Sequence, residues 1–184
     1  MTPISWLLHD QALVRTFTVE DADDLAHLVD VNAERLDRWF PWVAVSRQPE
    51  GARGFIERSL ASETDVEGNG IWVEGSLVGA IGLSVHTAWN GGELGYWLDA
   101  GAEGRGLVTR ACKLFIDHGF QELGLNRIQI HSAVDNERSR AVAERLGFTQ
   151  EGVLRRCGRV GGDRYLDLVV YGLLHDEWPR ATTR

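Results

Sequence analysis

Apolar positions along the chain follow two periods, and each change of period predicts a boundary between a helix and a strand. Spacings of three and four residues predict four amphipathic helices, over 22–31, 49–60, 108–120 and 139–146. β-branched, aromatic and alternating runs predict strands over 13–17, 71–73, 77–85, 93–98, 127–133, from 148 onward and over 165–174. This order indicates one α+β layer structure, a mixed but mostly antiparallel sheet of about seven strands flanked by about four helices.

Short polar and glycine-containing segments predict how these elements begin and end. Thr18 and Asp21 have the spacing of a capping box, so a helix is expected to follow them. Glu74-Gly75 separates two apolar runs as a hairpin turn does, and Gly147 is expected to stop the last helix. The sequence contains no linker, repeat or low-complexity tract, which favours a single domain over 1–184.

Composition restricts the class of protein. At 184 residues, 43% hydrophobic and 25% charged, the chain is typical of a globular domain with enough core to need no metal or disulfide. Cys112 and Cys157 form no CxxC pair, so we expect no metal site and a reducing compartment, the cytoplasm. The first ten residues lack the features of a signal peptide, and no segment approaches the ~20 apolar residues of a membrane span.

The net charge of −8 is unevenly distributed along the chain. Residues 1–100 contain six basic and 16 acidic side chains, whereas residues 101–164 contain 11 basic and 8 acidic ones. We expect no nucleic-acid partner, because phosphate neutralisation needs clustered Lys and Arg. One interpretation is that solvated helix faces happen to differ. The other is that the second half binds an anionic ligand and the first half faces a cationic one.

A glycine-containing loop carries the first chemical signal. Gly104-Arg105-Gly106 lies between a predicted strand and the start of the most regular predicted helix. Glycines allow backbone N–H groups to approach a ligand, and a helix N-terminus adds about half a positive charge. The loop therefore predicts a diphosphate cradle. It lacks the Lys-Ser/Thr of a P-loop, and an isolated G-x-G also occurs in simple turns.

A second motif reinforces the first. Asn136-Glu137-Arg138-Ser139 opens the last predicted helix, and Leu146-Gly147-Phe148 closes it. Together with the glycine loop, this order resembles the cofactor-binding half of the GNAT acetyltransferases. The resemblance extends from Leu13 to Trp178. Further strings are similar to the RimL/RimJ branch, the ribosomal-protein N-terminal acetyltransferases: Gly95–Leu98, Asn126–Ile128, Asn136–Val142 and Asp167–Tyr171.

The resemblance implies a GNAT fold in which acetyl-CoA lies in a V-shaped opening between strands 93–98 and 127–133. It implies that Asn136 bonds the pantetheine arm or an ordered water. Gly101 departs from the family pattern, which usually has Gln or Arg there, but backbone amides do most of the diphosphate binding. The implied backbone contacts are Tyr96, Trp97 and Leu98 for the pantetheine arm, and Gly104, Arg105, Gly106, Leu107, Val108 and Thr109 for the diphosphate.

Acetyl transfer to an amine needs a neutral amine, a stabilised oxyanion and a proton for the leaving thiolate. The resemblance assigns the thiolate proton to Ser139, whose alternative role is to satisfy a backbone amide at the helix start. The base stays open between Glu93, favoured because a dry or acidic site would raise its pKa, and Glu67 in the loop before strand 69–73. His86 is a third candidate, and His131 is interpreted as a core or wall residue.

Four further residues have alternative interpretations. The resemblance gives Trp39 and Trp42 a role in the wall of the acceptor site, although large aromatics are more often core residues. Tyr165 and Asp167 either approach the cofactor thiol or are edge-strand residues only.

The sequence thus predicts an N-acetyltransferase that moves acetyl from acetyl-CoA to a primary amine by direct attack in a ternary complex, without a metal. The resemblance favours the N-terminal α-amine of a ribosomal protein. One alternative acceptor is a small molecule, such as an aminoglycoside, a polyamine or an amino-nucleotide. Another alternative is a non-catalytic acyl-CoA-binding regulatory module. A homodimer through strand 165–174 also stays open, and no membrane partner is expected.

Overall fold

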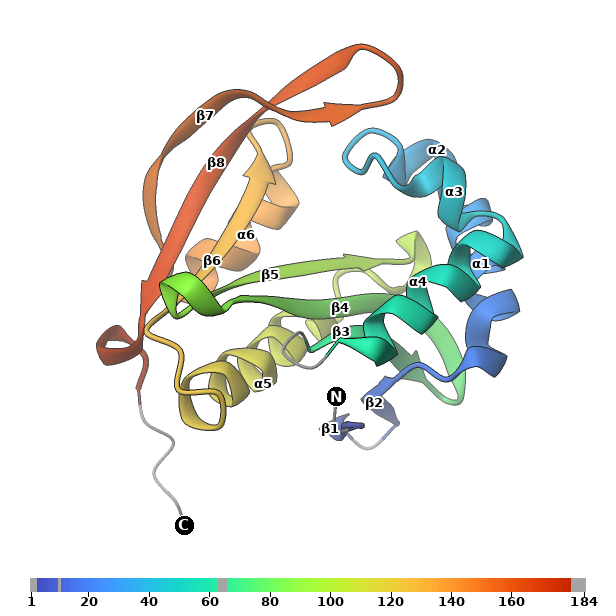
Figure 1. Ribbon diagram of the computed structural model, residues 1–184, viewed down its shortest axis with the longest axis horizontal. Helices are drawn as coiled ribbons and strands as arrows, with labels where there is room; N and C mark the ends of the chain where they lie inside the picture. The colour runs from blue at the N-terminus through green and yellow to red at the C-terminus, as the bar shows by residue number, and fades with distance from the viewer. Residues whose placement is uncertain (1–2, 10, 63–65, 180–184) are drawn as a thin grey trace.

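The computed structural model describes residues 3–9, 11–62 and 66–179, and of Glu67 only the backbone. Its strands form one sheet in the order β1-β2-β3-β4-β5-β6-β8-β7 (Figure 1). Neighbouring strands pair antiparallel, except that β5 and β6 are parallel. The strands are β1 Ser5–His9, β2 Ala12–Thr16, β3 Val66–Val73, β4 Ser76–His86, β5 Gly91–Leu98, β6 Arg127–Ala133, β7 Thr149–Val160 and β8 Arg164–Leu174. The α+β class and the mostly antiparallel sheet are confirmed.

Helices cover both faces of this sheet. Alternation along a strand sends neighbouring side chains to opposite faces. Ile71 and Val73 pack into the core beneath α5, whereas Trp72 between them packs with α1 and α4. The two cores therefore lie on opposite faces of β3. The helices of the described residues are α1 Ala22–Val31, α2 Ala33–Leu36, α3 Val43–Ser46, α4 Pro49–Ala61, α5 Leu107–Gln121 and α6 Glu137–Arg145.

The predicted local signals act where they were expected. The Thr18 N–H donates to Asp21 Oδ2 over 2.7 Å, which completes the capping box before α1. Glu74 and Gly75 have φ of 51° and 80° and form the two-residue turn between β3 and β4. Gly147 has φ of 85° immediately after α6, a conformation that glycine adopts without steric cost.

The structure adds elements that the hydrophobic pattern did not predict. β1 is a further strand, so the sheet has eight strands instead of about seven. Trp6, Leu7 and Leu8 are consecutive apolar residues in this strand, so the sequence shows no alternation of polar and apolar positions. α2 and α3 are four residues each. A single helical turn is too short to display a period of 3.6 residues.

The central feature is the point where β5 and β6 separate. Their parallel pairing joins Gly91 to Arg127, Gly92 to Ile128 and Glu93 to Gln129. Beyond Glu93, β5 continues to follow β4, while β6 continues to follow β8. The sheet therefore opens into a V at this point, with β5 as one arm and β6 as the other (Figure 1). The expected splay is confirmed.

The β7–β8 hairpin extends beyond the V toward α2 (Figure 1). Arg164 Nη2 donates to the carbonyl oxygens of Asp37 and Arg38, which follow α2, over 3.3 and 2.8 Å. The pairing of β7 with β8 is interrupted by irregularities between Gln150 and Gly152 and between Leu154 and Gly158. Because β8 is paired on both sides, only its faces remain for contact with another subunit.

Candidate active site

A pocket of about 350 Å³ occupies the V. The arms of the V contribute Glu93, Tyr96 and His131, and α6 contributes Ser139. Trp39, in the segment after α2, lines another wall, and the β7–β8 hairpin lines a further one. The pocket thus gathers several of the predicted site residues from separate parts of the sequence around one space.

Glu93 and His131 face each other at the closed end of the V, and they form an ion pair when His131 is protonated. His131 Nδ1 lies 3.4 Å from Glu93 Oε1, and Gln129 Nε2 lies 3.5 Å from Glu93 Oε2. The hydrogen bond to His131 lowers the pKa of Glu93, and the same bond raises the pKa of His131. The expectation that surroundings would raise the pKa of Glu93 is therefore wrong, because the carboxylate reaches the imidazole of His131, two residues beyond its register partner Gln129 on β6.

Ser139 occupies the third position of α6 and faces Tyr96. Asn136 is the N-cap of this helix, and its Oδ1 accepts a hydrogen bond from the Ser139 N–H over 3.2 Å. The Tyr96 hydroxyl donates to the Ser139 carbonyl oxygen over 3.1 Å and lies 3.2 Å from Ser139 Oγ. Burial raises the pKa of Tyr96, so its hydroxyl keeps its proton. The backbone amide of Ser139 is satisfied by Asn136, which leaves the serine hydroxyl facing the pocket.

The glycine loop leads directly into α5. Gly104 and Gly106 have φ of 76° and 73°, and Gly106 is the N-cap of the helix. A Cβ on Gly104 would meet open space, so the loop backbone is accessible from outside. The first N–H groups of a helix have no intrahelical acceptor. An accessible loop backed by free helix amides fits the diphosphate of a CoA molecule.

The remaining base candidates belong to β3 and β4, which are not arms of the V. Glu67 is within β3, not in a loop, because β3 begins at Val66. β4 separates β3 from β5, and the Glu67 side chain lies outside the described residues. His86 ends β4 and lines a second pocket with Trp89 and Arg127. His86 does not line the pocket in the V, but its charge contributes to lowering the pKa of Glu93.

Of the four residues with alternative interpretations, only Trp39 lines the pocket. Trp39 lines the pocket, whereas Trp42 packs on Trp97 with ring centroids 6.0 Å apart. On β8 the pocket is lined by Leu166 and Leu168. The alternation of a strand turns Tyr165 and Asp167 to the other face. There the Asp167 carboxylate accepts a hydrogen bond from the Arg156 N–H over 2.7 Å. A role near the cofactor thiol is therefore not supported for Tyr165 or Asp167.

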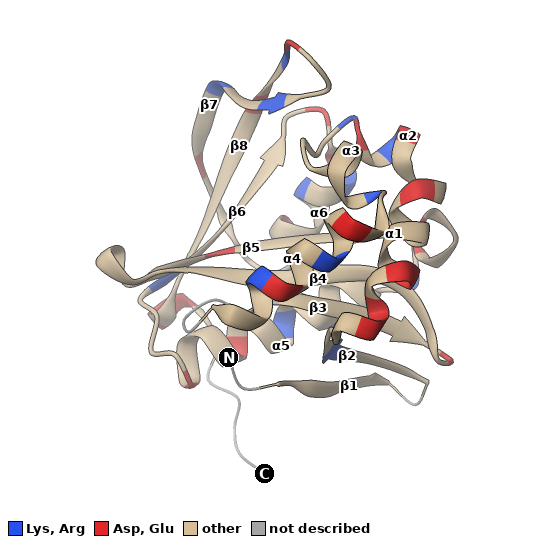
Figure 2. Ribbon diagram, turned by 45° about the vertical axis from the view of Figure 1, so that its right-hand side comes forward, with Lys and Arg blue, Asp and Glu red and all other residues tan. Residues whose placement is uncertain are grey.

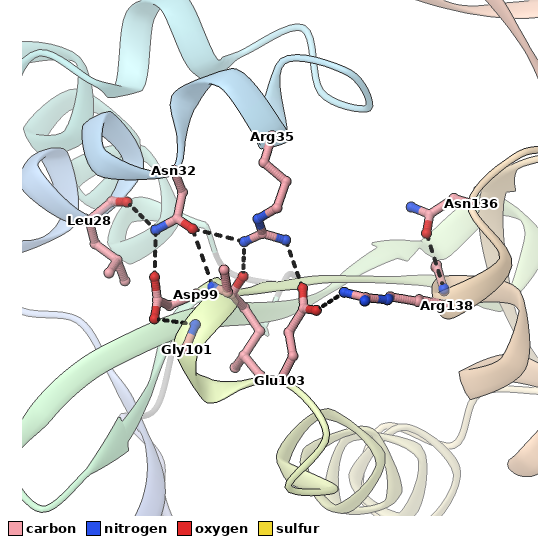
Figure 3. A network of polar contacts seen from close by, with 11 residues as sticks. Leu28, Asn32, Arg35, Asp99, Gly101, Glu103, Asn136 and Arg138 are labelled. Carbon is pink, nitrogen blue, oxygen red and sulfur yellow. Dashed lines mark hydrogen bonds and ion pairs between the residues drawn. The ribbon is translucent and has the colours of Figure 1, made fainter.

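A polar network that sequence reasoning missed connects α1 and α2 with the glycine loop (Figure 3). Asn32 Nδ2 donates to Asp99 Oδ1 over 2.8 Å, and Asn32 Oδ1 accepts from Arg35 Nη2 over 2.9 Å. Arg35 Nη1 lies 2.8 Å from Glu103 Oε1, and Arg138 Nη1 pairs with Glu103 Oε2. No short motif signals this network, because its members come from three separate segments.

The charge distribution follows the architecture (Figure 2). Asp23, Asp24 and Asp30 are exposed on α1, at the edge of the molecule that carries the acidic half of the sequence. Exposed arginines lie on the β7–β8 hairpin and around the glycine loop, among them Arg105 and Arg110. Among the described residues, no group of three or more His, Cys, Asp and Glu could hold a metal ion. No helix in this part of the chain is long and apolar enough to cross a membrane.

Known proteins with similar sequences are acetyltransferases. The acetyltransferase (GNAT) domain family matches residues 11–149. A candidate ribosomal N-acetyltransferase of Bacillus subtilis (strain 168), YdaF, is 37% identical over 179 residues, covering 93% of this chain and 95% of the relative. The ribosomal-protein-serine acetyltransferase of Escherichia coli (strain K12) is 35% identical over 107 residues, covering 58% and 59%.

Structural comparison extends the similarity to a protein solved with its ligands. The crystal structure of the microcin C7 self-immunity acetyltransferase MccE, in complex with acetyl-CoA and AMP, is 27% identical to this chain. It covers 91% of this chain and 94% of its own, with a TM-score of 0.82. The similarity therefore includes both arms of the V and the helices around them.

Proposed function

The chain belongs to the GNAT family of acetyltransferases, and from that premise we propose that it acetylates the N-terminal α-amine of a protein. Acetyl-CoA is the acetyl donor. The observation that carries the proposal is the arrangement of the pocket in the V. Glu93 and His131 lie at its closed end, and Ser139 with Tyr96 lies on its other side. An amine and a thioester that meet in this pocket have groups for both proton transfers within one space.

The first proton transfer deprotonates the amine. Glu93 faces Nδ1 of His131, which leaves Nε2 as the ring nitrogen able to accept a proton. In our proposal the neutral imidazole takes the amine proton while Glu93 orients the ring and stabilises the resulting charge. An α-amine has a pKa near ~7.7–8.0, against ~10.4 for a lysine side chain, so this acceptor requires only a weak base.

The second proton transfer completes the reaction. As the new N–C bond forms, its nitrogen loses a further proton to solvent, and as the C–S bond breaks, the leaving thiolate needs a proton. In the proposal, the Ser139 hydroxyl donates this proton and recovers one from solvent, with Tyr96 holding the serine in place. The amides of Gly104, Arg105, Gly106, Leu107, Val108 and Thr109 would hold the diphosphate, and the β5 backbone at Tyr96, Trp97 and Leu98 would pair with the pantetheine arm.

Three observations favour a chain terminus as the acceptor. The relatives from E. coli and B. subtilis are named for acetylation of ribosomal proteins. Arg164 contacts Asp37 and Arg38, so the hairpin is connected to the segment after α2. The hairpin and this segment together form a continuous wall of the pocket. A flexible peptide end can enter such a walled pocket more easily than a side chain on a folded surface. The acidic α1 face also suits a cationic amine.

A small-molecule acceptor is the second candidate. Trp39 and Phe40 line the pocket, and their rings could stack on a planar group of a ligand. MccE, the relative solved with acetyl-CoA and AMP, holds a nucleotide as well as the acetyl donor. This combination favours an amino-nucleotide over a polyamine or an aminoglycoside, neither of which carries an aromatic ring system.

The acceptor classes can be separated by one assay of thiol release, with products identified by mass spectrometry. The panel contains peptides with a free N-terminal Ser, Ala or Met, the same peptides with a blocked N-terminus and one internal Lys, spermidine, an aminoglycoside and an aminoacyl-nucleotide analogue. We expect kcat/KM for free N-termini to exceed that for blocked peptides at least about tenfold. A higher kcat/KM for any small amine would replace the proposed acceptor.

A further inference from the structure

One carboxylate joins the two arms at the open end of the V. β5 ends at Leu98 and continues into the loop that contains Glu103, while β6 ends at Ala133 and continues into the start of α6, which contains Arg138. Glu103 Oε2 pairs with Arg138 Nη1 (Figure 3). This ion pair therefore crosses from one arm of the V to the other, next to the predicted diphosphate cradle.

The two partners of Glu103 are held very differently. Arg35 is part of the network with Asn32 and also donates to the Leu98 carbonyl oxygen, so its guanidinium is fixed. The Arg138 side chain is 84% exposed, against 33% for Arg35. An exposed ion pair contributes little stability because water and salt screen it. Arg138 is therefore the partner that can leave Glu103 easily.

A bound diphosphate would compete for Arg138. Glu103 immediately precedes Gly104, so an anion on the loop amides lies beside a carboxylate that repels it. Guanidinium groups bind phosphate oxygens with two parallel hydrogen bonds, which one carboxylate already shared with Arg35 cannot match. Transfer of Arg138 to the diphosphate would replace a weak pair with a stronger one and leave Glu103 neutralised by Arg35.

We propose that Glu103 is a positioning residue that holds Arg138 across the open end of the V until the diphosphate of the cofactor binds Arg138 in its place. The proposal rests on the proposed function, because it requires CoA on the glycine loop. It makes Glu103 an internal competitor of the cofactor. Its removal therefore strengthens cofactor binding, which is the opposite of the effect of removing a residue that only supports the loop.

Calorimetric titration with CoA tests this in Glu103→Gln, in Arg138→Gln and in the double variant. We expect Glu103→Gln to bind CoA about two- to fivefold more tightly, the range that an exposed ion pair allows. We expect Arg138→Gln to bind it more weakly. In the double variant, Glu103→Gln should bring no gain, because the released arginine is absent. Acetyl-pantetheine, which lacks the diphosphate, should bind wild type and Glu103→Gln equally.

Glu137→Gln is the matched control, since it removes one negative charge from an exposed residue next to Arg138. It should leave CoA affinity close to the wild-type value. If folded Glu103→Gln binds CoA with unchanged or weaker affinity, the proposed role of Glu103 is overturned. The proposal is also overturned if Glu103→Gln strengthens CoA binding in the Arg138→Gln background, because the gain would then come from removing charge repulsion between Glu103 and CoA. If Glu103→Gln does not fold, equal CoA binding by wild type and Arg138→Gln overturns the proposal. Failure of the wild type to bind CoA would instead refute the proposed function.

Discussion

The hydroxyl oxygen of Tyr96 lies 3.2 Å from Oγ of Ser139, although the two residues are 43 positions apart in the sequence. Tyr96 belongs to one arm of the V, and Ser139 belongs to the helix that follows the other arm. The contact therefore connects the β5 arm of the V with the helix that follows the β6 arm. It also fixes the serine hydroxyl at the place where the proposed reaction needs a proton donor.

Loss of the Ser139 hydroxyl should slow the chemical step. We expect Ser139→Ala to lower kcat by roughly 10²–10⁴ if the hydroxyl protonates the thiolate. Tyr96→Phe should lower kcat about tenfold, because one positioning hydrogen bond of ~1.4 kcal/mol is lost. The double variant should be no slower than Ser139→Ala. Steady-state kinetics and CoA titration check this, with Tyr165→Phe as the control. Wild-type turnover in Ser139→Ala would reduce the serine to a structural residue.

The ion pair of Glu93 and His131 predicts a pH dependence of turnover. In wild type, kcat should rise as pH increases through the raised pKa of His131, because only the neutral imidazole accepts a proton. Glu93→Gln removes the main cause of that raised pKa, so the inflection should move to lower pH while kcat falls. His131→Asn should abolish the inflection. The profile is measured at saturating acceptor, with the exposed His27→Asn as the control. An unmoved inflection in Glu93→Gln would contradict the pairing.

The same pair predicts a pH dependence of stability. The raised pKa of His131 stabilises the fold below its ordinary value of 6.5, and this contribution is lost as pH rises through the raised pKa. The lowered pKa of Glu93 stabilises the fold above 4.5, and that contribution is lost as pH falls. His131→Asn should therefore cost more free energy of unfolding at about pH 5.5 than at about pH 9.

The expected difference between the two pH values is only ~0.5 kcal/mol, because solvent screens the pair and the Glu93 side chain is 37% exposed. Urea unfolding of wild type and His131→Asn at both pH values measures it. An equal cost of the substitution at the two pH values would show that the pair is not ionised in the folded protein.

Alanine substitutions at two glycines can distinguish the effect of backbone strain on stability from the effect of the glycine loop on CoA binding. Gly104 and Gly124 both have positive φ, 76° and 63°, and a Cβ on either would meet open space. Gly104→Ala and Gly124→Ala should therefore each cost ~1–2 kcal/mol of unfolding free energy. Only Gly104→Ala should also weaken CoA binding, because Gly124 follows the far end of α5. Thermal unfolding and calorimetry compare the two variants. Equal CoA affinity would remove Gly104 from the cradle.

The sequence predicted best what depends on neighbours in the chain. α5 shows its period over 15 residues, and the capping box and the Glu74-Gly75 turn involve contacts within three residues. The position of the V was also predicted, through the resemblance of its strands to those of a known family. α2 was not predicted because four residues are too few to show a helical period, and β1 was not predicted because its apolar residues are consecutive instead of alternating with polar ones.

The site was less predictable, because its chemistry depends on register. A carboxylate at a strand end has an ordinary sequence context, and nothing near Glu93 in the chain indicates a partner. The parallel register of β5 with β6 brings it to His131, and this contact reverses the expected direction of its pKa. The bridge of Glu103 to Arg35 and Arg138 arises in the same way, from the arrangement of three separate segments.

The irregular pairing of β7 affects how the protein behaves in solution. β7 is the last strand of the sheet, and its outer edge is a potential template for another polypeptide. Its two irregularities bend this edge, and Arg156, within the second of them, has φ of 53°. Exposed Arg155, Arg156 and Arg159 add like charges that repel an identical edge. β7 is therefore poorly suited to recruit a neighbouring molecule, which protects a concentrated sample against aggregation through this edge of the sheet.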